Sequence, residues 1–218
     1  RGRANALRGA LSGSLPAESF SSKNMMDVLD LCLGCKSCKS ECPSNVDMAK
    51  IKYEYLYQYY KTRKIPLSSK LVADIHRMSS ILAPVAPIAN VVTRSLPVRL
   101  LFEKVAGFDR SRPSPKVVRN TFQKWFSKHK PQSTNSRGKI VLFHDTFMNF
   151  NHPTIGMSAT RVLEALGFEV VVLNERKFCG RPMISKGLLD QAGENARHNV
   201  DLLYPHVQNG VKIVGCEA

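Results

Sequence analysis

The sequence lacks several features that define common protein classes. It contains no uninterrupted apolar run of about eighteen residues, and so offers no single membrane-spanning helix. It has neither a P-loop nor a G-x-G-x-x-G turn, and the absence of the latter removes nicotinamide-cofactor binding as a claim for this chain. The first residues, Arg1-Gly2-Arg3, include no initiator Met and do not start a secretory signal segment. We therefore expect an internal piece of a longer protein.

Acidic residues are also scarce, and charge is unevenly distributed along the chain. There are 17 Asp and Glu against 32 Lys and Arg, which gives a formal net charge of +15. Residues 65–139 alone carry +11, whereas residues 140–218 carry −1. Such a charge raises the alternative of a nucleic-acid-binding protein, but no recognisable reading motif accompanies it. A basic surface that docks an acidic redox partner or an anionic membrane fits better, and we expect no nucleic-acid partner.

Four of the six cysteines fall within eleven residues, at Cys32, Cys35, Cys38 and Cys42. Their spacing is C-x2-C-x2-C-x3-C-P, which is typical of a bacterial-type ferredoxin run that holds a [4Fe–4S] cluster. Gaps this short do not suit a set of structural disulfides, and a chain of this length builds a core without them. Zinc is the main alternative, although structural zinc sites more often use two C-x2-C knuckles separated by a longer loop. We predict that these four cysteines are metal ligands.

The role of the fourth cysteine is open on the spacing alone. In two-cluster ferredoxins the last cysteine of a run ligates the other cluster. Either Cys42 completes the cluster of its own run, or it serves a second cluster whose run lies outside this piece. In the second case Cys32, Cys35 and Cys38 need a distant fourth ligand.

Three segments follow from the pattern of apolar residues, and together they predict an α+β protein. Residues 1–64 form a helical ferredoxin-like module, and residues 65–137 form a basic, proline-punctuated helical connector. Residues 138–218 alternate strand, helix, strand, helix and strand, which implies a C-terminally truncated α/β domain with a parallel sheet. The expected elements are strands over 138–145, 168–173 and 211–215 and helices over 154–166 and 187–204. Loops at the carboxyl ends of such strands are the expected site.

Finer expectations concern the helices before this sheet. After Pro43, Ser44 or Asn45 is a candidate cap for a helix that continues to about Arg63. In the connector, helices are expected near 67–82, 97–106 and 115–128, separated by prolines. The apolar run from Ile81 to Phe102 either lies on a membrane surface or is a buried part of the connector.

Cys179 and Cys216 each follow a predicted strand, so both are expected at the same edge of the sheet. They are either buried thiols that behave as small apolar residues or further metal ligands. His144-Asp145 also ends a strand, where the pair acts either in acid–base chemistry or in loop hydrogen bonds.

Several motifs occur in the order seen in one family. They are GRANALRGALSG, LDLCLGCKSCKSECPSNVDMAK, HDTFMNFNHPTIG, FCGRPMISKGLLDQA and IVGCEA. In this order the chain resembles the iron–sulfur portion of bacterial FAD-linked D-2-hydroxyacid dehydrogenases of the D-lactate, D-2-hydroxyglutarate and glycolate oxidase type. The resemblance includes the Cys-Cys-Gly type domain that this family shares with heterodisulfide reductase.

The resemblance implies an oxidoreductase in which FAD oxidises the hydroxy acid and electrons leave through two [4Fe–4S] clusters. Cys32, Cys35, Cys38 and Cys42 match the second ferredoxin run of the family. FAD is then expected in an upstream part or in a partner flavin dehydrogenase subunit, so this fragment alone is not catalytically complete. The implied acceptor is a quinone or a redox protein. The implied location is the cytoplasm, with peripheral contact at the inner face of the cytoplasmic membrane as an option.

The Cys-Cys-Gly region departs from the family pattern. Phe178 stands in place of the first paired cysteine, and Thr146 stands near the place of an upstream cysteine. Only Cys179 and Cys216 remain, which makes an additional cluster doubtful. The alternatives are a heterodisulfide reductase-like or other iron–sulfur oxidoreductase subunit, and a zinc-stabilised nucleic-acid-binding or adaptor protein.

Overall fold

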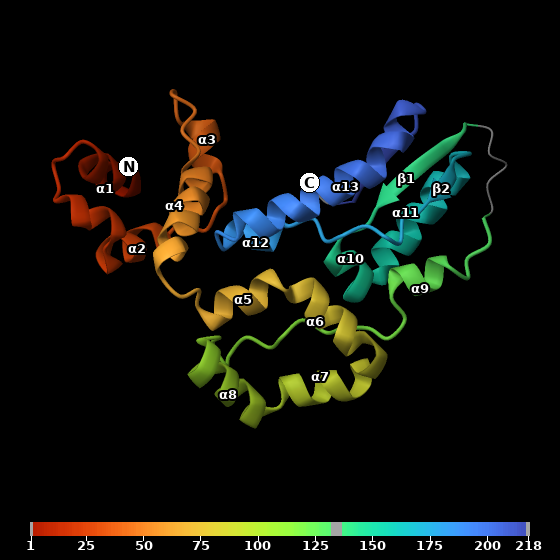
Figure 1. The fold of residues 1–218 in the computed structure, drawn as a ribbon. Coiled ribbons are helices and arrows are strands. Elements are labelled where there is room, and N and C mark those ends of the chain that lie inside the picture. Colours follow the sequence, from red (N-terminus) through yellow and green to blue (C-terminus); the bar gives the residue numbers. More distant parts are fainter. Residues whose placement is uncertain (1, 132–136, 217–218) are drawn as a thin grey trace. The chain divides into compact units, whose positions relative to one another are not determined.

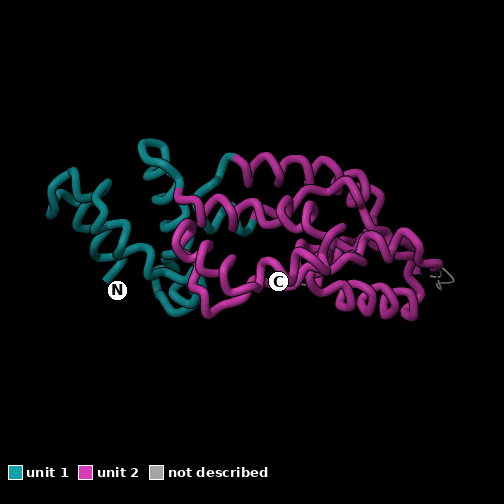
Figure 2. Tube along the Cα trace, turned by 90° about the horizontal axis from the view of Figure 1, so that it is seen from below, with its two compact units in different colours: residues 1–65, 181–190 teal, residues 66–180, 191–218 magenta. Residues whose placement is uncertain are grey.

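The computed structural model describes residues 2–131 and 137–216, which form two compact units (Figure 2). Unit 1 comprises the chain up to Ile65 together with Arg181–Asp190, and unit 2 comprises Pro66–Gly180 and the chain from Gln191 onward. Residues 132–136 of the predicted connector lie outside the described residues, as do Arg1, Glu217 and Ala218. The mixture of helices with one small parallel sheet confirms the predicted α+β class.

Unit 1 is helical, and its helices are shown in Figure 1. They are α1 (Gly2–Leu11), the 3-10 helix η1 (Ala17–Ser21), α2 (Lys23–Asp30), α3 (Ser37–Glu41), α4 (Met48–Thr62) and α12 (Arg181–Ser185). The cap of α4 is Asp47, whose Oδ1 accepts from the Lys50 amide at 2.9 Å. The predicted caps Ser44 and Asn45 are therefore wrong. Asn45 is in the left-handed region (φ 52°), so the chain is still turning there and the helix begins later.

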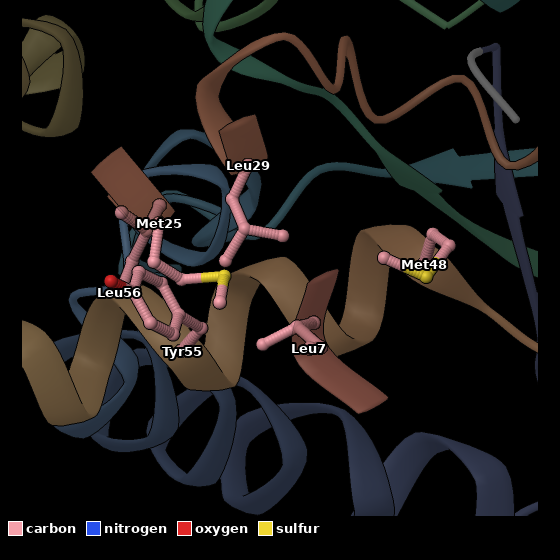
Figure 3. Close-up of a cluster of buried hydrophobic side chains, with 6 residues drawn as sticks. All are labelled: Leu7, Met25, Leu29, Met48, Tyr55 and Leu56. Atoms are coloured by element: carbon pink, nitrogen blue, oxygen red, sulfur yellow. The ribbon is translucent and has the colours of Figure 1, made fainter. Parts of the chain in front are cut away.

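The core of unit 1 lies between α1, α2 and α4. Its buried side chains are Leu7, Met25, Leu29, Met48, Tyr55 and Leu56 (Figure 3). The ring of Tyr55 contacts Phe20 edge-on at 5.3 Å and stacks on Tyr59 at 5.8 Å between centroids. This tyrosine therefore contributes mainly apolar packing.

The first part of unit 2 is a series of short helices. They are α5 (Leu67–Ala73), α6 (Ile75–Leu82), the 3-10 helix η2 (Ala83–Val85), α7 (Ala86–Arg94), α8 (Leu96–Ala106) and α9 (Phe122–Phe126). Pro87 and Pro97 lie in the first turns of α7 and α8, where a missing N–H costs no hydrogen bond. The predicted helix over 115–128 is wrong except at α9. The Asn90 side chain bonds both the N–H and the carbonyl of Val117, so that segment cannot use these groups in a helix.

The second part of unit 2 is a three-stranded parallel sheet in the order β2-β1-β3. Its strands are β1 (Lys139–Phe143), β2 (Glu169–Val171) and β3 (Lys212–Gly215), and its helices are α10 (Thr146–Phe150), α11 (Pro153–Ala165) and α13 (Leu189–Gln208). Val141 of β1 pairs with Val171 on one side and with Ile213 on the other. The predicted strand and helix alternation is confirmed, and the last helix continues past Pro205.

No described helix is by itself long and apolar enough to cross a membrane. The stretches Ile75–Arg94 and Leu96–Ala106 pass a length and composition test only when taken together, and they are bent by 79°.

Gly156 provides a test of packing in unit 2. A methyl group there would lie 2.6 Å from the ring of Phe122, which is fully buried in the core beside the sheet. We expect Gly156→Ala to destabilise unit 2 by about 1–3 kcal/mol, because overpacking outweighs the gain in helix propensity. Denaturant unfolding followed by the fluorescence of Trp125, which stacks on Phe122, measures this.

Gly193→Ala is the matched control. Gly193 also lies inside a helix, but the nearest atom to an added methyl group is the end of the Arg197 side chain at 3.7 Å. It should stabilise the protein by up to about 1 kcal/mol. Equal effects of the two substitutions would contradict the packing argument.

Candidate metal centre

The four clustered cysteines lie on and around α3 in unit 1. Cys32 follows α2, Cys35 lies in the exposed loop, Cys38 lies within α3, and Cys42 ends α3. Cys38 also packs against the core of unit 1. The run therefore begins in a loop without regular secondary structure and ends on one short helix.

Positive backbone angles shape this loop. Gly34 has φ 72° and Lys36, which precedes α3, has φ 61°. Only glycine adopts the first angle without strain, and the site is also crowded. A methyl group on Gly34 would lie 2.6 Å from the hydroxyl oxygen of Tyr53. The close approach of α4 to the loop therefore depends on glycine at this position.

Two cations attach the loop to the helices of unit 1. Arg3 of α1 donates to the Leu31 carbonyl at 2.7 Å. The Lys52 ammonium on α4 donates to the Cys32 carbonyl at 2.9 Å, to the Asp30 carbonyl at 3.3 Å and to the Asp30 carboxylate at 3.2 Å. Lys52 is only 7% exposed, so these bonds replace water for a nearly buried charge. The backbone on both sides of the first cysteine is thereby fixed.

The backbone of the loop also favours thiolates. The Ser37 N–H, followed by the Ser37 hydroxyl, lowers the pKa of Cys35. The N–H groups of Val46 and Ser44 lower the pKa of Cys42. Metal ligation requires thiolates, and amide donors aimed at sulfur are the surroundings that iron–sulfur ligands use. The residues present therefore fit an iron–sulfur group in donor chemistry and in backbone surroundings.

The thiols are not gathered at one point. Over residues 2–131 and 137–216, no three His, Cys, Asp or Glu side chains lie close enough together to hold a metal ion. Metal binding commonly orders its own ligands, because a preformed site is rarely present before binding. The assignment of Cys32, Cys35, Cys38 and Cys42 as ligands therefore stays a prediction.

A second group of functional side chains lies in unit 2, at the carboxyl edge of the sheet. His144 follows β1 and is fully buried, and the Arg176 Nε lies 3.2 Å from its ring Nε2. Burial, with the Arg176 and His76 charges, lowers the pKa of His144 to about 3. Burial lowers the pKa of Arg176 to about 10. Asp145 accepts from the Met148 N–H and so caps α10. The His144-Asp145 pair thus serves local structure, which was one of the two sequence interpretations.

Cys179 and Cys216 both lie at this edge and are exposed. Partial burial raises the pKa of the Cys216 thiol, and the charge of Asp145 acts in the same direction. The interpretation of both as buried apolar thiols is therefore wrong. Phe178, in place of a family cysteine, stacks on His76 at 5.8 Å, and His76 also bonds Thr146 at 3.1 Å. At the two positions where the family pattern has cysteine, Phe178 thus makes an aromatic contact and Thr146 makes a hydroxyl hydrogen bond.

Sequence reasoning missed Lys52 and Arg176. The burial of Lys52 could have been predicted from helical periodicity, because Lys52 shares the buried face of α4 with Met48, Tyr55 and Leu56. A lysine on an apolar face needs internal partners. No comparable signal marks Arg176, which lies in a loop and meets His144 only through the fold.

The curated proteins to which this chain is similar are oxidoreductases or parts of them. Over 170 residues it is 34% identical to the C subunit of the anaerobic glycerol-3-phosphate dehydrogenase of Escherichia coli (strain K12), covering 78% of this chain and 42% of that protein. It is 24% identical over 207 residues to the D-2-hydroxyglutarate dehydrogenase of the same organism, covering 90% of this chain and 20% of that protein. It is 22% identical over 202 residues to the glycolate oxidase iron-sulfur subunit of that organism, covering 87% and 45%. No family model and no solved structure matches the chain.

These homologues confirm the resemblance to the iron–sulfur portion of FAD-linked hydroxyacid dehydrogenases. The chain spans less than half of the length of each of these three relatives. It is related to dehydrogenases and to an iron–sulfur subunit, which supports an oxidoreductase role.

Lys52 allows the attachment of the loop to be tested. We expect Lys52→Met to destabilise the backbone around Cys32 by about 1–3 kcal/mol, because carbonyls that accept from the ammonium lose their donor. Hydrogen exchange read by mass spectrometry should show faster exchange over residues 28–38. Lys50→Met, an exposed lysine on the same helix, is the control. Unchanged exchange in Lys52→Met would contradict the role of this side chain.

His144 gives unit 2 a dependence on pH. Its folded pKa of about 3 lies below the ordinary 6.5, so below pH 6.5 the unfolded chain binds a proton that the folded chain excludes. Stability should therefore fall as the pH drops from 6.5 toward 3, by up to about 1.4 kcal/mol per pH unit for this group. His76, whose pKa burial also lowers, adds in the same direction.

Denaturant unfolding followed by circular dichroism at several pH values measures this slope. His144→Gln should flatten it, while the same change at exposed His152 serves as control. A slope that His144→Gln leaves as steep as before would refute the assignment.

Proposed function

We propose that this chain is the iron–sulfur electron-transfer part of a flavin-linked 2-hydroxyacid dehydrogenase. It receives electrons from a flavin dehydrogenase domain or subunit and passes them to a quinone or a redox protein. The observation that carries the proposal is the run Cys32, Cys35, Cys38 and Cys42 in a chain that is 34% identical over 170 residues to a dehydrogenase subunit. The similarity to a glycolate oxidase iron-sulfur subunit supports the same interpretation.

In this proposal the four thiolates of the run hold a [4Fe–4S] cluster, which supplies one-electron transfer when bound. Residues 1–64 then act as a ferredoxin-like module. The amides of Ser37, Ser44 and Val46 stabilise the thiolates. Lys52 and Arg3 hold the backbone on either side of Cys32. These contacts restrain the backbone around Cys32, while the gathering of the four thiolates is left to metal binding.

The second metal option is zinc, which also accepts four thiolates. The even two-residue gaps and the Cys42-Pro43 ending favour iron–sulfur. Cys179 and Cys216 provide only two thiols at the sheet edge, so we propose no further cluster there. The basic segment 65–139 is proposed as a docking surface for a redox partner or for the inner face of a cytoplasmic membrane.

Metal analysis of the whole protein together with its flavin partner tests the proposal. After anaerobic reconstitution we expect iron and acid-labile sulfide in equal amounts, with an electron paramagnetic resonance signal on reduction. Cys35→Ala should remove most of the iron bound by this run, because a cubane site loses a ligand that no nearby thiol replaces. Cys179→Ala, at an exposed cysteine outside the run, is the control. Stoichiometric zinc without iron would contradict the proposal.

A further inference from the structure

The connector helices of unit 2 enclose an apolar cavity that the electron-transfer role does not use. Its volume is about 350 Å³, within the range of small-molecule sites. Apolar lining residues include Leu71, Ile75, Met78, Leu82, Phe102 and Phe108. They come from α5, α6, α8 and the segment after α8. Figure 1 shows α7 and α8 in yellow-green below α5 and α6, with that segment running between the two pairs.

One polar atom in the wall has no partner. The Nε of Arg99 on α8 is buried and has no hydrogen-bond partner among the residues that the structure describes. The Asn90 side chain, also in the lining, is hydrogen-bonded to the N–H and the carbonyl of Val117, and the Thr93 hydroxyl donates to the Ala89 carbonyl. A buried guanidinium N–H without an acceptor costs free energy, so this position favours a molecule that brings an oxygen acceptor.

The charge of the wall selects the kind of acceptor. Arg99, Arg110 and Arg112 line the cavity together with the carboxylate of Asp109, and Arg110 is paired with Glu103 at 3.6 Å. The Ser111 hydroxyl and N–H lower the pKa of Asp109, so it stays ionised, and the net charge of the lining is +2. Guanidinium groups match phosphate and carboxylate oxygens in geometry and in charge. An apolar body with an anionic head fits this combination.

The surface beside the cavity indicates where such a molecule comes from. Large apolar side chains of α7 and α8 point into solvent, among them Ile88 at 70% and Val91 at 73% exposed, with Leu96, Leu101 and Val105 near 60%. Arg94 and Lys104 lie in the last turns of the same two helices, within a segment, residues 65–139, that carries +11. Exposed apolar side chains on short helices together with basic side chains are the composition of an interfacial, membrane-contacting surface.

We propose that this cavity binds an acyl chain of an anionic membrane phospholipid, whose head or ester oxygens accept hydrogen bonds from Arg99. Contact of α7 and α8 with the bilayer attaches the connector to the membrane and brings the lipid to the cavity. The cavity does not involve the cysteine run, so this proposal can be tested separately from the proposed electron-transfer function.

A reporter inside the cavity tests this. Phe108→Trp places an indole in the wall, and vesicles whose phospholipids carry brominated acyl chains quench it only on direct contact. We expect strong quenching with phosphatidylglycerol vesicles and little with phosphatidylcholine vesicles. In the reporter background, Arg99→Gln should weaken the apparent affinity about tenfold, as expected for one charged hydrogen bond. Arg94→Gln, which removes the same charge outside the lining, should have a much smaller effect.

Ala89→Phe separates the cavity from the surface. Ala89 lines the cavity and is buried, so a phenyl ring there fills the space. Quenching should be lost while the protein still sediments with anionic vesicles, and the iron content should not change. Equal quenching by both lipids, equal effects of Arg99→Gln and Arg94→Gln, or binding of free oleate without binding to vesicles would overturn the proposal. Arg99→Gln decides the case if Ala89→Phe does not fold.

Discussion

The arrangement of unit 1 depends on the buried ammonium of Lys52. The apolar side chains Leu31 and Leu33 of the loop that carries the thiols are exposed and add nothing to the core, so the loop depends on contacts with the helices around it. Lys52 fixes the end of α2 and the Cys32 carbonyl from one side, and Arg3 fixes the Leu31 carbonyl from another. Because Gly34 admits the Tyr53 hydroxyl at close range, α4 contacts the same loop again. A ligand-bearing segment without a core is thus held in shape by polar contacts.

In unit 2 the central strand β1 determines where the functional side chains lie. With β2 and β3 paired in parallel on opposite sides of β1, the carboxyl ends of all three strands lie at one edge of the sheet. His144, Asp145 and Cys216 are all at this edge, at positions set by strand direction alone. At this edge His144 and the charged Arg176 are buried, while the two thiols are exposed.

Local patterns predicted most of the fold. The alternation of strands and helices after residue 138 was recognisable because the strands are short continuous apolar runs and the helices have apolar residues at helical spacing. The parallel sheet that this alternation predicted is present. The segment 115–128 was not predictable, since its backbone is bonded by Asn90 from a helix far away in the sequence. The spacing of the cysteines indicated the kind of ligand. It did not reveal that Lys52 and Arg176 would be buried against partners distant in sequence, because those contacts exist only in the folded chain.

Unit 1 is closed by a segment from far downstream. Arg181–Asp190 returns to it, where Asp190 accepts from the Tyr57 hydroxyl at 2.9 Å and Gly187 packs so tightly on Leu56 that no side chain fits. The chain therefore passes between the units three times, and no single cut separates them. In evolutionary terms, a gene fusion or split that moved only the first 65 residues would leave this helical module open on one flank.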